Sequence, residues 1–364
     1  MANFDVAAMA LKAVCPSNEI LYDDKGLPSV MVRIPKMTYA ELDLGSSTNV
    51  FPAFVVNGHE IDEIYISKYQ NIVHNGRAYS LPGRDPGNTI YGADALAACT
   101  AKGDGWHLMT RMEWMAIALW CKKNGTMPKG NNNYGKDTGD SIYQAIPSCP
   151  RDASNRIQRV ATGTGPLSWS HDGTPSGIWD LNGNVYEWVG GIRTVNGEIQ
   201  ILANNNAADK SNSQELNSDQ WKAISGSSGL LITPNGSGTT SGSVKLRWDT
   251  NHWNLTTSNT ADGTTTYQGC TLESVTYDNS VGAAAQLLLQ ALGLLKYDTG
   301  SGAYGGDYIY ANSVEAERGF RCGGHWYGGA HAGVFCAGGD SSFFSLRSGG
   351  IGFRSAFVKL PTGT

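Results

Sequence analysis

Seven cysteines and seven histidines are the side chains of this sequence with the most distinctive chemistry. The cysteines form no Cys-x-x-Cys pair and have no zinc-site spacing. An odd count allows a free thiol beside any disulfide bonds; the alternative is seven reduced, mostly buried thiols. No Ser/His/Asp set, carboxylate pair or phosphate-binding loop has the arrangement that catalysis requires. We therefore expect a protein that is not an enzyme and has no catalytic cofactor.

A second group of chemically active side chains lies near the C-terminus. It mixes aromatic, hydrogen-bonding and charged residues among glycines, as antibody binding loops do: His325, Tyr327, His331, Asp340, Phe343, Phe344 and Arg347. This mixture predicts a ligand-binding surface. The alternative is that the two phenylalanines belong to a core strand and that the histidines are ordinary, satisfied groups.

The composition limits the fold and the partners. Charged residues make up only 16% of the chain and glycine is abundant, which is typical of a loop-rich α+β protein. A net charge of -5 provides no basic surface for nucleic acid or for an anionic membrane. The longest apolar stretch, 281–295, is too short to cross a bilayer. The N-terminus does not resemble a secretion signal, because Lys12 interrupts its apolar run, so we expect a protein that is soluble when made.

The clearest element is a helix over 110–123. Thr110 and Glu113 form a capping box, in which each side chain bonds the other residue's backbone N–H, and Gly125 ends the helix. Further helices are expected over 88–102 and 281–295, and strands over 29–34 and 61–68. Residues 1–50 show no clear long helix.

The chain is expected to divide into an N-terminal segment of short strands, 1–55, which is a candidate assembly contact, and a main domain, 56–364. Within the domain, about 193–305 resembles an insertion, since Ser/Thr/Asn/Gly clusters alternate there with short apolar pieces. Trp221, Trp248 and Trp253 indicate that the insertion is folded, because large aromatic side chains need burial.

The most specific local pattern is Gly-Ile-Trp-Asp-Leu-Asn-Gly-Asn-Val-Tyr-Glu-Trp-Val at 177–189. By itself it predicts a tight turn over 181–184, flanked by strands that bury Trp179, Val185 and Trp188. The segment also resembles the "GLYDMxGNVWEW" signature of the formylglycine-generating-enzyme (sulfatase-modifying factor) family, a branch of the C-type-lectin-like fold.

Other pieces resemble motifs of that family in the same order, at 63–69, 107–114, 323–326 and 352–354. The resemblance implies an α+β, C-type-lectin-like fold of the formylglycine-generating-enzyme type, loop-rich and with a large insertion. It departs at Cys322, which precedes the Gly pair where the family usually has Arg-Gly-Gly.

The enzyme chemistry of the family is not expected here. Active members bind copper with two closely spaced cysteines soon after the motif that 323–326 resembles. Only Cys336 follows at that place, so this loop cannot form a two-thiolate site.

A second resemblance concerns the C-terminus. Gly-Gly-His-Trp-Tyr-Gly-Gly-Ala-His-Ala-Gly-Val-Phe at 323–335, followed by Ile-Gly-Phe-Arg at 351–354, is similar to the variable proteins of diversity-generating retroelements. In those systems template adenines are randomised, and an AAC codon never yields Lys, Glu, Gln, Met or Trp. Although 42 of the 364 residues are Lys, Glu, Gln or Met, the 33 residues from Cys322 to Arg354 contain none. Composition alone predicts about 4.

This resemblance implies a variable region at about 322–354. It adds six predicted ligand-binding positions, Gly328, Cys336, Gly338, Ser342, Leu346 and Gly349, and four framework residues, Trp326, Gly333, Phe335 and Arg354. The implied function is hypervariable binding of a host cell-surface protein or glycan by a phage tail adhesin. The adhesin would join other tail proteins in the virion, and related phage adhesins suggest a homotrimer. The alternatives are a bacterial surface or secreted variable protein, a fixed-site lectin, and a formylglycine-generating-type oxidase.

Calcium is a further alternative for the 181–189 region. Asn184 and Glu187 lie where some relatives of the fold place calcium-coordinating oxygens. Equally, Asn184 could serve only its turn and Glu187 could bond backbone donors.

Overall fold

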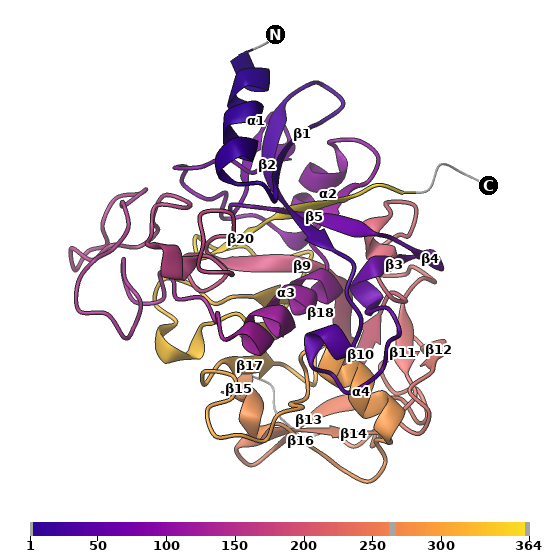
Figure 1. Ribbon diagram of the computed structural model, residues 1–364. Helices are drawn as coiled ribbons and strands as arrows, with labels where there is room; N and C mark the ends of the chain where they lie inside the picture. Colours follow the sequence, from indigo (N-terminus) through magenta and orange to yellow (C-terminus); the bar gives the residue numbers. More distant parts are fainter. Residues whose placement is uncertain (1–2, 262–266, 361–364) are drawn as a thin grey trace.

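The computed structural model describes residues 3–261 and 267–360, which form a loop-rich α+β fold built on two sheets (Figure 1). The smaller sheet has the strand order β1-β2-β5-β21-β8. Its strands are β1 (Asn18–Tyr22), β2 (Pro28–Pro35), β5 (Glu63–Ser67), β8 (Trp106–Leu108) and β21 (Ser355–Val358). The predicted strands over 29–34 and 61–68 are thus confirmed. β21 lies between β5 and β8, so the end of the described chain is held inside a sheet made by its first third.

The larger sheet carries the candidate site. Its main path is β15-β17-β19-β18-β9-β10-β13-β14-β16, with β11 and β12 attached beside β10 and β20 beside β9. The strands are β9 (Tyr186–Val195), β10 (Glu198–Ile201), β11 (Lys222–Ile224), β12 (Leu231–Ile232), β13 (Lys245–Asp249), β14 (His252–Thr256), β15 (Gln268–Thr271), β16 (Thr276–Tyr277), β17 (Tyr308–Ala311), β18 (Arg318–Cys322), β19 (Ala337–Ser341) and β20 (Ile351–Phe353). Two small hairpins complete the described strands: β3 (Val55–Val56) with β4 (His59–Glu60), and β6 (Ile72–His74) with β7 (Arg77–Tyr79).

The α-helices of the described residues are α1 (Asn3–Val14), α2 (Gly92–Thr100), α3 (Arg111–Asn124) and α4 (Ala283–Ala291). The last three confirm the predicted helices, although α2 and α4 are shorter than expected. None of the helices in the described ranges is both long enough and apolar enough to cross a membrane.

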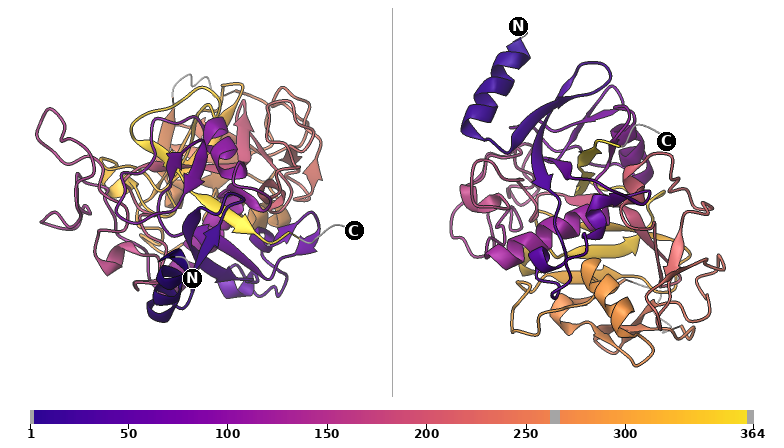
Figure 2. Two further views of the ribbon diagram at one scale, coloured as in Figure 1. Left: turned by 90° about the horizontal axis from the view of Figure 1, so that it is seen from above. Right: turned by 45° about the vertical axis from the view of Figure 1, so that its right-hand side comes forward.

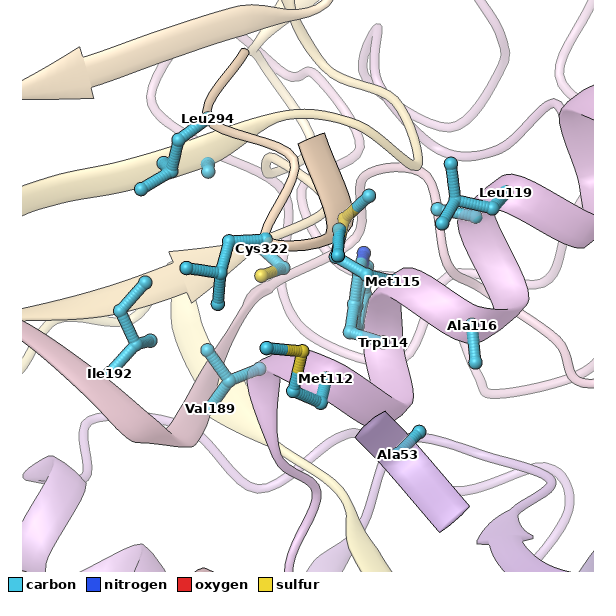
Figure 3. Close-up of a cluster of buried hydrophobic side chains, with 14 of the residues drawn as sticks. Ala53, Met112, Trp114, Met115, Ala116, Leu119, Val189, Ile192, Leu294 and Cys322 are labelled. Atoms are coloured by element: carbon cyan, nitrogen blue, oxygen red, sulfur yellow. The ribbon is translucent and has the colours of Figure 1, made fainter. Parts of the chain in front are cut away.

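Helix α3 packs across β9 and forms the centre of the core. Its capping box is present as predicted, since the Thr110 side chain accepts from the Glu113 backbone N–H and Glu113 bonds the Thr110 N–H. Figure 3 shows Met112, Met115 and their neighbours on α3 packed against side chains of β9 and β18. The indole Nε1 of Trp114 donates to the Val334 carbonyl over 2.7 Å, which ties this helix to the segment that precedes β19.

The N-terminal expectation needs one correction. Residues 3–14 form helix α1, where the sequence was expected to have no clear long helix. Its sequence is rich in alanine, the strongest helix former, so local propensity accounts for it. The helix projects from the rest of the fold, as Figures 1 and 2 show. The strands of the predicted segment 1–55 share a sheet with the predicted domain, because β2 pairs with β5 over Met31–Pro35.

The predicted insertion, about 193–305, extends the larger sheet. Strands β10 to β14 continue the sheet beyond β9, and β15 and β16 also belong to it. Trp253 is fully buried and Trp221 nearly so, which confirms that this part of the chain is folded. Trp248 is partly buried and packs edge-on against Trp253.

Candidate ligand-binding cleft

An open cleft of about 490 Å³ lies at the C-terminal part of the larger sheet. Ten of its fourteen lining residues fall between 322 and 354, and the whole set is Tyr186, Tyr267, Tyr310, Arg321, His325, Tyr327, Gly328, His331, Ala332, Asp340, Ser341, Leu346, Ser348 and Ile351. The volume lies within the roughly 300–1,000 Å³ of small-molecule sites. The sheet brings these residues together because β19 pairs with β18 on one side and with β17 on the other.

Stacked aromatic rings form two walls of the cleft. The His325 and Tyr327 rings are stacked with centroids 3.7 Å apart, and the His331 and Tyr308 rings with centroids 3.6 Å apart. The Tyr310 hydroxyl lies 3.2 Å from Nδ1 of His331 and fixes that ring further. Burial lowers the pKa of His325 to about 4 and also lowers the pKa of His331. Both rings are therefore neutral at pH 7.

An ion pair forms the base of the cleft. Nη2 of Arg321 lies 2.7 Å from Oδ1 of Asp340, and both side chains are largely shielded from solvent. The guanidinium packs over the rings of Tyr186 and Trp188, at 4.9 and 5.6 Å from their centroids. Its Nε is buried without a hydrogen-bond partner. Stacking and pairing hold the guanidinium in one position.

Backbone contacts hold the loop that carries the cleft residues. Gly323 and Gly324 have φ values of +88° and +81°, a backbone conformation that residues with a side chain rarely adopt. At Gly333, a Cβ atom would lie only 2.1 Å from Oδ1 of Asp307. Oδ2 of Asp307 accepts the backbone N–H of Phe335 over 2.7 Å. Burial raises the pKa of Asp307 to about 8.

The predicted framework residue Trp326 is buried, and its backbone is bonded on both sides. Its N–H donates to the Asn184 carbonyl over 3.1 Å, and its carbonyl accepts from the Tyr134 N–H over 2.7 Å. These bonds do not involve variable side chains. The backbone path at the rim is thus set by groups outside the predicted contact positions.

Of the thirteen predicted ligand-binding positions, the structure brings six to the cleft: His325, Tyr327, Gly328, His331, Asp340 and Leu346. The other seven lie elsewhere: Cys336, Gly338, Ser342, Phe343, Phe344, Arg347 and Gly349. Arg347 is exposed and lies over the ring of Tyr91, while Gly349 lies beside Trp326 and Arg159.

Three of these seven positions are corrected, because they are buried rather than exposed. Cys336 has no exposed surface, and its Sγ lies 3.5 Å from the Tyr186 hydroxyl. Gly338 is covered by the ion pair at the base of the cleft. Phe343 packs edge-on against Trp188, with ring centroids 5.5 Å apart, and belongs to the core beside α2. Phe343 is thus a core residue, although it lies on a turn after β19 and not on the core strand of the alternative interpretation.

Phe344 and Ser342 face a different side of the molecule. Phe344 is partly buried and lines a groove of about 270 Å³ between α2 and residues 210–215. Ser342 Oγ donates to Glu317 Oε2 over 2.9 Å, and the Phe343 N–H donates to the other carboxylate oxygen over 3.4 Å. Glu317 therefore holds the chain where it leaves β19.

Eight of the fourteen cleft residues were not among the predicted positions. Ala332, Ser341, Ser348 and Ile351 lie within the predicted variable region, whereas Tyr186, Tyr267, Tyr310 and Arg321 lie outside it. Tyr186 lies within the 177–189 motif and Arg321 directly precedes Cys322, so both belong to segments that predict framework and not ligand contacts. The Tyr-Ile-Tyr-Ala alternation at 308–311 was a usable signal, since alternate residues of a strand share a face.

The residues present do not fit a calcium ion at Asn184 and Glu187. Both oxygens of Glu187 bond the guanidinium of Arg354. The Asn184 side-chain oxygen accepts from the Val160 N–H and from the Asn131 amide. Within the described ranges, no three His, Cys, Asp or Glu side chains are grouped to hold a metal ion.

All seven cysteines are free thiols and six are buried, as the second alternative for them predicts. Cys322 Sγ accepts from Nη1 of Arg111 over 2.8 Å. Burial raises the pKa of the Cys322 and Cys336 thiols.

No family model matches this chain, and no curated protein matches it. Among solved structures, the chain is similar to PvdO from Pseudomonas aeruginosa, with a TM-score of 0.36 and 13% identity over 94% of this chain and 98% of that one. It is also similar to the P3c and U1 variants of Major Tropism Determinant, each with a TM-score of 0.30 and 10% identity over 94% of this chain and 71% of the other. These TM-scores are too low to support the site by comparison, so its assignment depends on the geometry of the cleft in this structure.

Proposed function

We propose that this chain is a ligand-binding protein whose specificity is carried by the cleft and diversified by a retroelement. One observation carries the proposal. Ten of the fourteen cleft residues come from the stretch that lacks Lys, Glu, Gln and Met. Backbone contacts, such as Phe335 N–H to Asp307 and Trp326 N–H to the Asn184 carbonyl, hold the part of this stretch that carries the cleft loop. A loop held in this way keeps its path when its exposed side chains change, because those side chains contribute little to stability.

The setting we favour is a phage tail adhesin that binds a protein or glycan of the host cell surface. Several copies displayed together, for example as a homotrimer in the virion, would strengthen attachment by avidity even when a single site binds weakly. A bacterial surface or secreted variable protein is the second candidate. The same binding surface serves both settings.

The burial and pairing of the reactive side chains also favour a binding role over an oxidase or another enzyme. The Cys336 thiol is fully buried and burial raises its pKa, so it is a poor nucleophile and a poor metal ligand. The carboxylate at the base of the cleft, Asp340, is paired with Arg321.

The test is to sequence this locus and its flanking DNA in several isolates. We expect substitutions concentrated between Cys322 and Arg354, at adenine positions of a nearby template repeat beside a reverse transcriptase gene. Substitutions scattered evenly along the chain would refute diversification. An unvarying sequence together with a calcium requirement would favour the fixed-site lectin.

A further inference from the structure

The side chains that line the cleft carry almost no net charge. Of the lining side chains that the structure describes, Arg321 and Asp340 alone carry a formal charge at neutral pH, and they pair with each other over 2.7 Å. The two histidines are neutral, because burial lowers the pKa of each. The Asp340 carboxylate would repel an anionic ligand, and the Arg321 guanidinium would repel a cationic one. The cleft therefore suits an uncharged ligand.

The walls present flat aromatic surfaces. Tyr327 is 54% exposed although its ring stacks on His325 and lies nearly parallel to the Tyr134 ring, with centroids 6.4 Å apart. The ring is therefore held in place while much of the residue stays open to solvent. His331, on the other wall, is exposed and is held by Tyr308 and Tyr310. An aromatic face carries partial negative charge and attracts the weakly positive C–H groups of a saturated ring.

The base offers donors and acceptors side by side. The Arg321 guanidinium carries five N–H donors, and its Nη2 donates to Asp340. The Asp340 carboxylate lies next to these donors and accepts a hydrogen bond from Ser341 Oγ over 3.1 Å. Two adjacent hydroxyl groups of a ligand can each accept from a guanidinium and donate to a carboxylate, and such charge-assisted bonds are the stronger kind.

We propose that the cleft binds a neutral oligosaccharide directly, without a metal ion. This inference rests on the proposed function, because it takes the cleft as the ligand site. A pyranose ring combines the two features that the cleft matches, an apolar C–H face for the aromatic walls and adjacent hydroxyls for the Arg321–Asp340 pair. A protein ligand would instead need an apolar anchor pocket. The larger aliphatic side chains among the described lining residues are only Leu346 and Ile351.

The experiment uses the full chain on a printed array of defined neutral and acidic oligosaccharides from bacterial and animal cell surfaces, with and without EDTA. We expect retention of at least one neutral oligosaccharide, unchanged by EDTA. Isothermal titration with that oligosaccharide should show at least a tenfold loss of affinity for Asp340→Asn and for Tyr327→Ala. The control is Tyr277→Ala, an exposed tyrosine of β16 outside the cleft, which should bind as the unmodified chain does.

The inference is overturned if no oligosaccharide is retained at about millimolar concentration, if EDTA abolishes binding, or if only acidic oligosaccharides bind. It is also overturned if both cleft variants bind normally while thermal unfolding shows that they are folded. Variation among isolates does not depend on the class of ligand. The locus could thus vary between 322 and 354 while the chain binds none of the oligosaccharides. That result would refute the oligosaccharide inference without contradicting the proposed function.

Discussion

Arg354 and Glu187 form a buried, two-point ion pair. Nε of Arg354 lies 2.5 Å from Oε2 of Glu187, and Nη2 lies 2.6 Å from Oε1. Nη1 of Arg354 donates to the Ser67 carbonyl, and Nη2 also donates to the Trp179 carbonyl. Ser67 belongs to the smaller sheet and Glu187 to the larger one, so a single side chain joins the two sheets where the predicted variable region ends.

Arg354→Met should lower the free energy of unfolding by about 3–5 kcal/mol, because it leaves Glu187 buried without its counter-charge. Urea denaturation followed by tryptophan fluorescence measures this. The matched control is Arg347→Met, since Arg347 is exposed and its contact with the Tyr91 ring should contribute at most about 1 kcal/mol. Equal effects of the two substitutions would show that the buried pair does not support the fold.

Asp307→Asn should stabilise the protein at alkaline pH. Burial raises the pKa of Asp307 to about 8, against about 3.9 for an unfolded chain. Between these values the folded state holds a proton that the unfolded state has lost, so the contribution of Asp307 to stability is fully present below about pH 4 and is lost as pH rises through 8. Asparagine stays neutral and keeps the oxygen that accepts the Phe335 N–H.

Thermal unfolding at pH 4, 6 and 9 checks this prediction. The variant and the unmodified chain should melt together at pH 4, and the variant should melt several degrees higher at pH 9. The control, Asp62→Asn, changes a carboxylate whose side chain is 92% exposed and should show no such divergence. Parallel melting curves at all three pH values would contradict a neutral Asp307.

The elements that sequence reasoning found are those whose signals are local. The Thr110–Glu113 capping box and the apolar periodicity after it lie within one stretch of chain, and the helix follows from them. Six of the fourteen cleft residues were predicted for the same reason, since residues such as His325 and Tyr327 belong to one continuous segment. Tyr186 and Tyr267 reach the cleft only because strands distant in sequence pair in one sheet, and no local pattern encodes that pairing.

Phe343 illustrates a different limit. It lies in a stretch without periodicity, so the sequence left open whether the side chain faces solvent or the core. The structure places it against Trp188, beneath Gly92 and Gly319, where an added Cβ would collide with its ring. Its burial depends on two glycines that are far away in sequence.

Gly333→Ala should be costly and Gly349→Ala nearly silent, although both glycines lie in the predicted variable region. A Cβ at position 333 would lie 2.1 Å from Asp307 Oδ1, whereas at 349 the nearest atom is 3.6 Å away. We expect a loss of about 1–3 kcal/mol for the first from overpacking and a change within about 0.5 kcal/mol for the second. Urea denaturation of both variants decides, and equal losses would contradict the distinction between framework and variable positions.

In a His331→Asn variant, which removes the second histidine of the cleft, ligand binding should be insensitive to pH across the usual histidine range. Burial lowers the pKa of His325 to about 4, so the ring that supports Tyr327 stays neutral from about pH 5.5 to 8. Titrations of a bound oligosaccharide should give one affinity over this range and a weaker one near pH 4, where protonation adds a charge to the cleft. A step in affinity near pH 6.5 would mean that His325 titrates as an exposed histidine does.

Phe343→Ala and Tyr327→Ala should separate the two roles of the predicted variable region. Phe343 is a buried part of the core beside α2, so its truncation should cost about 3–5 kcal/mol of unfolding free energy. Tyr327 is 54% exposed, so its truncation should leave stability within about 1 kcal/mol and weaken ligand binding. Urea denaturation and binding assays on the same two preparations measure the stability and the ligand affinity of each variant. If Tyr327→Ala destabilised the protein as much as Phe343→Ala does, the cleft rim would be part of the core and could not vary freely.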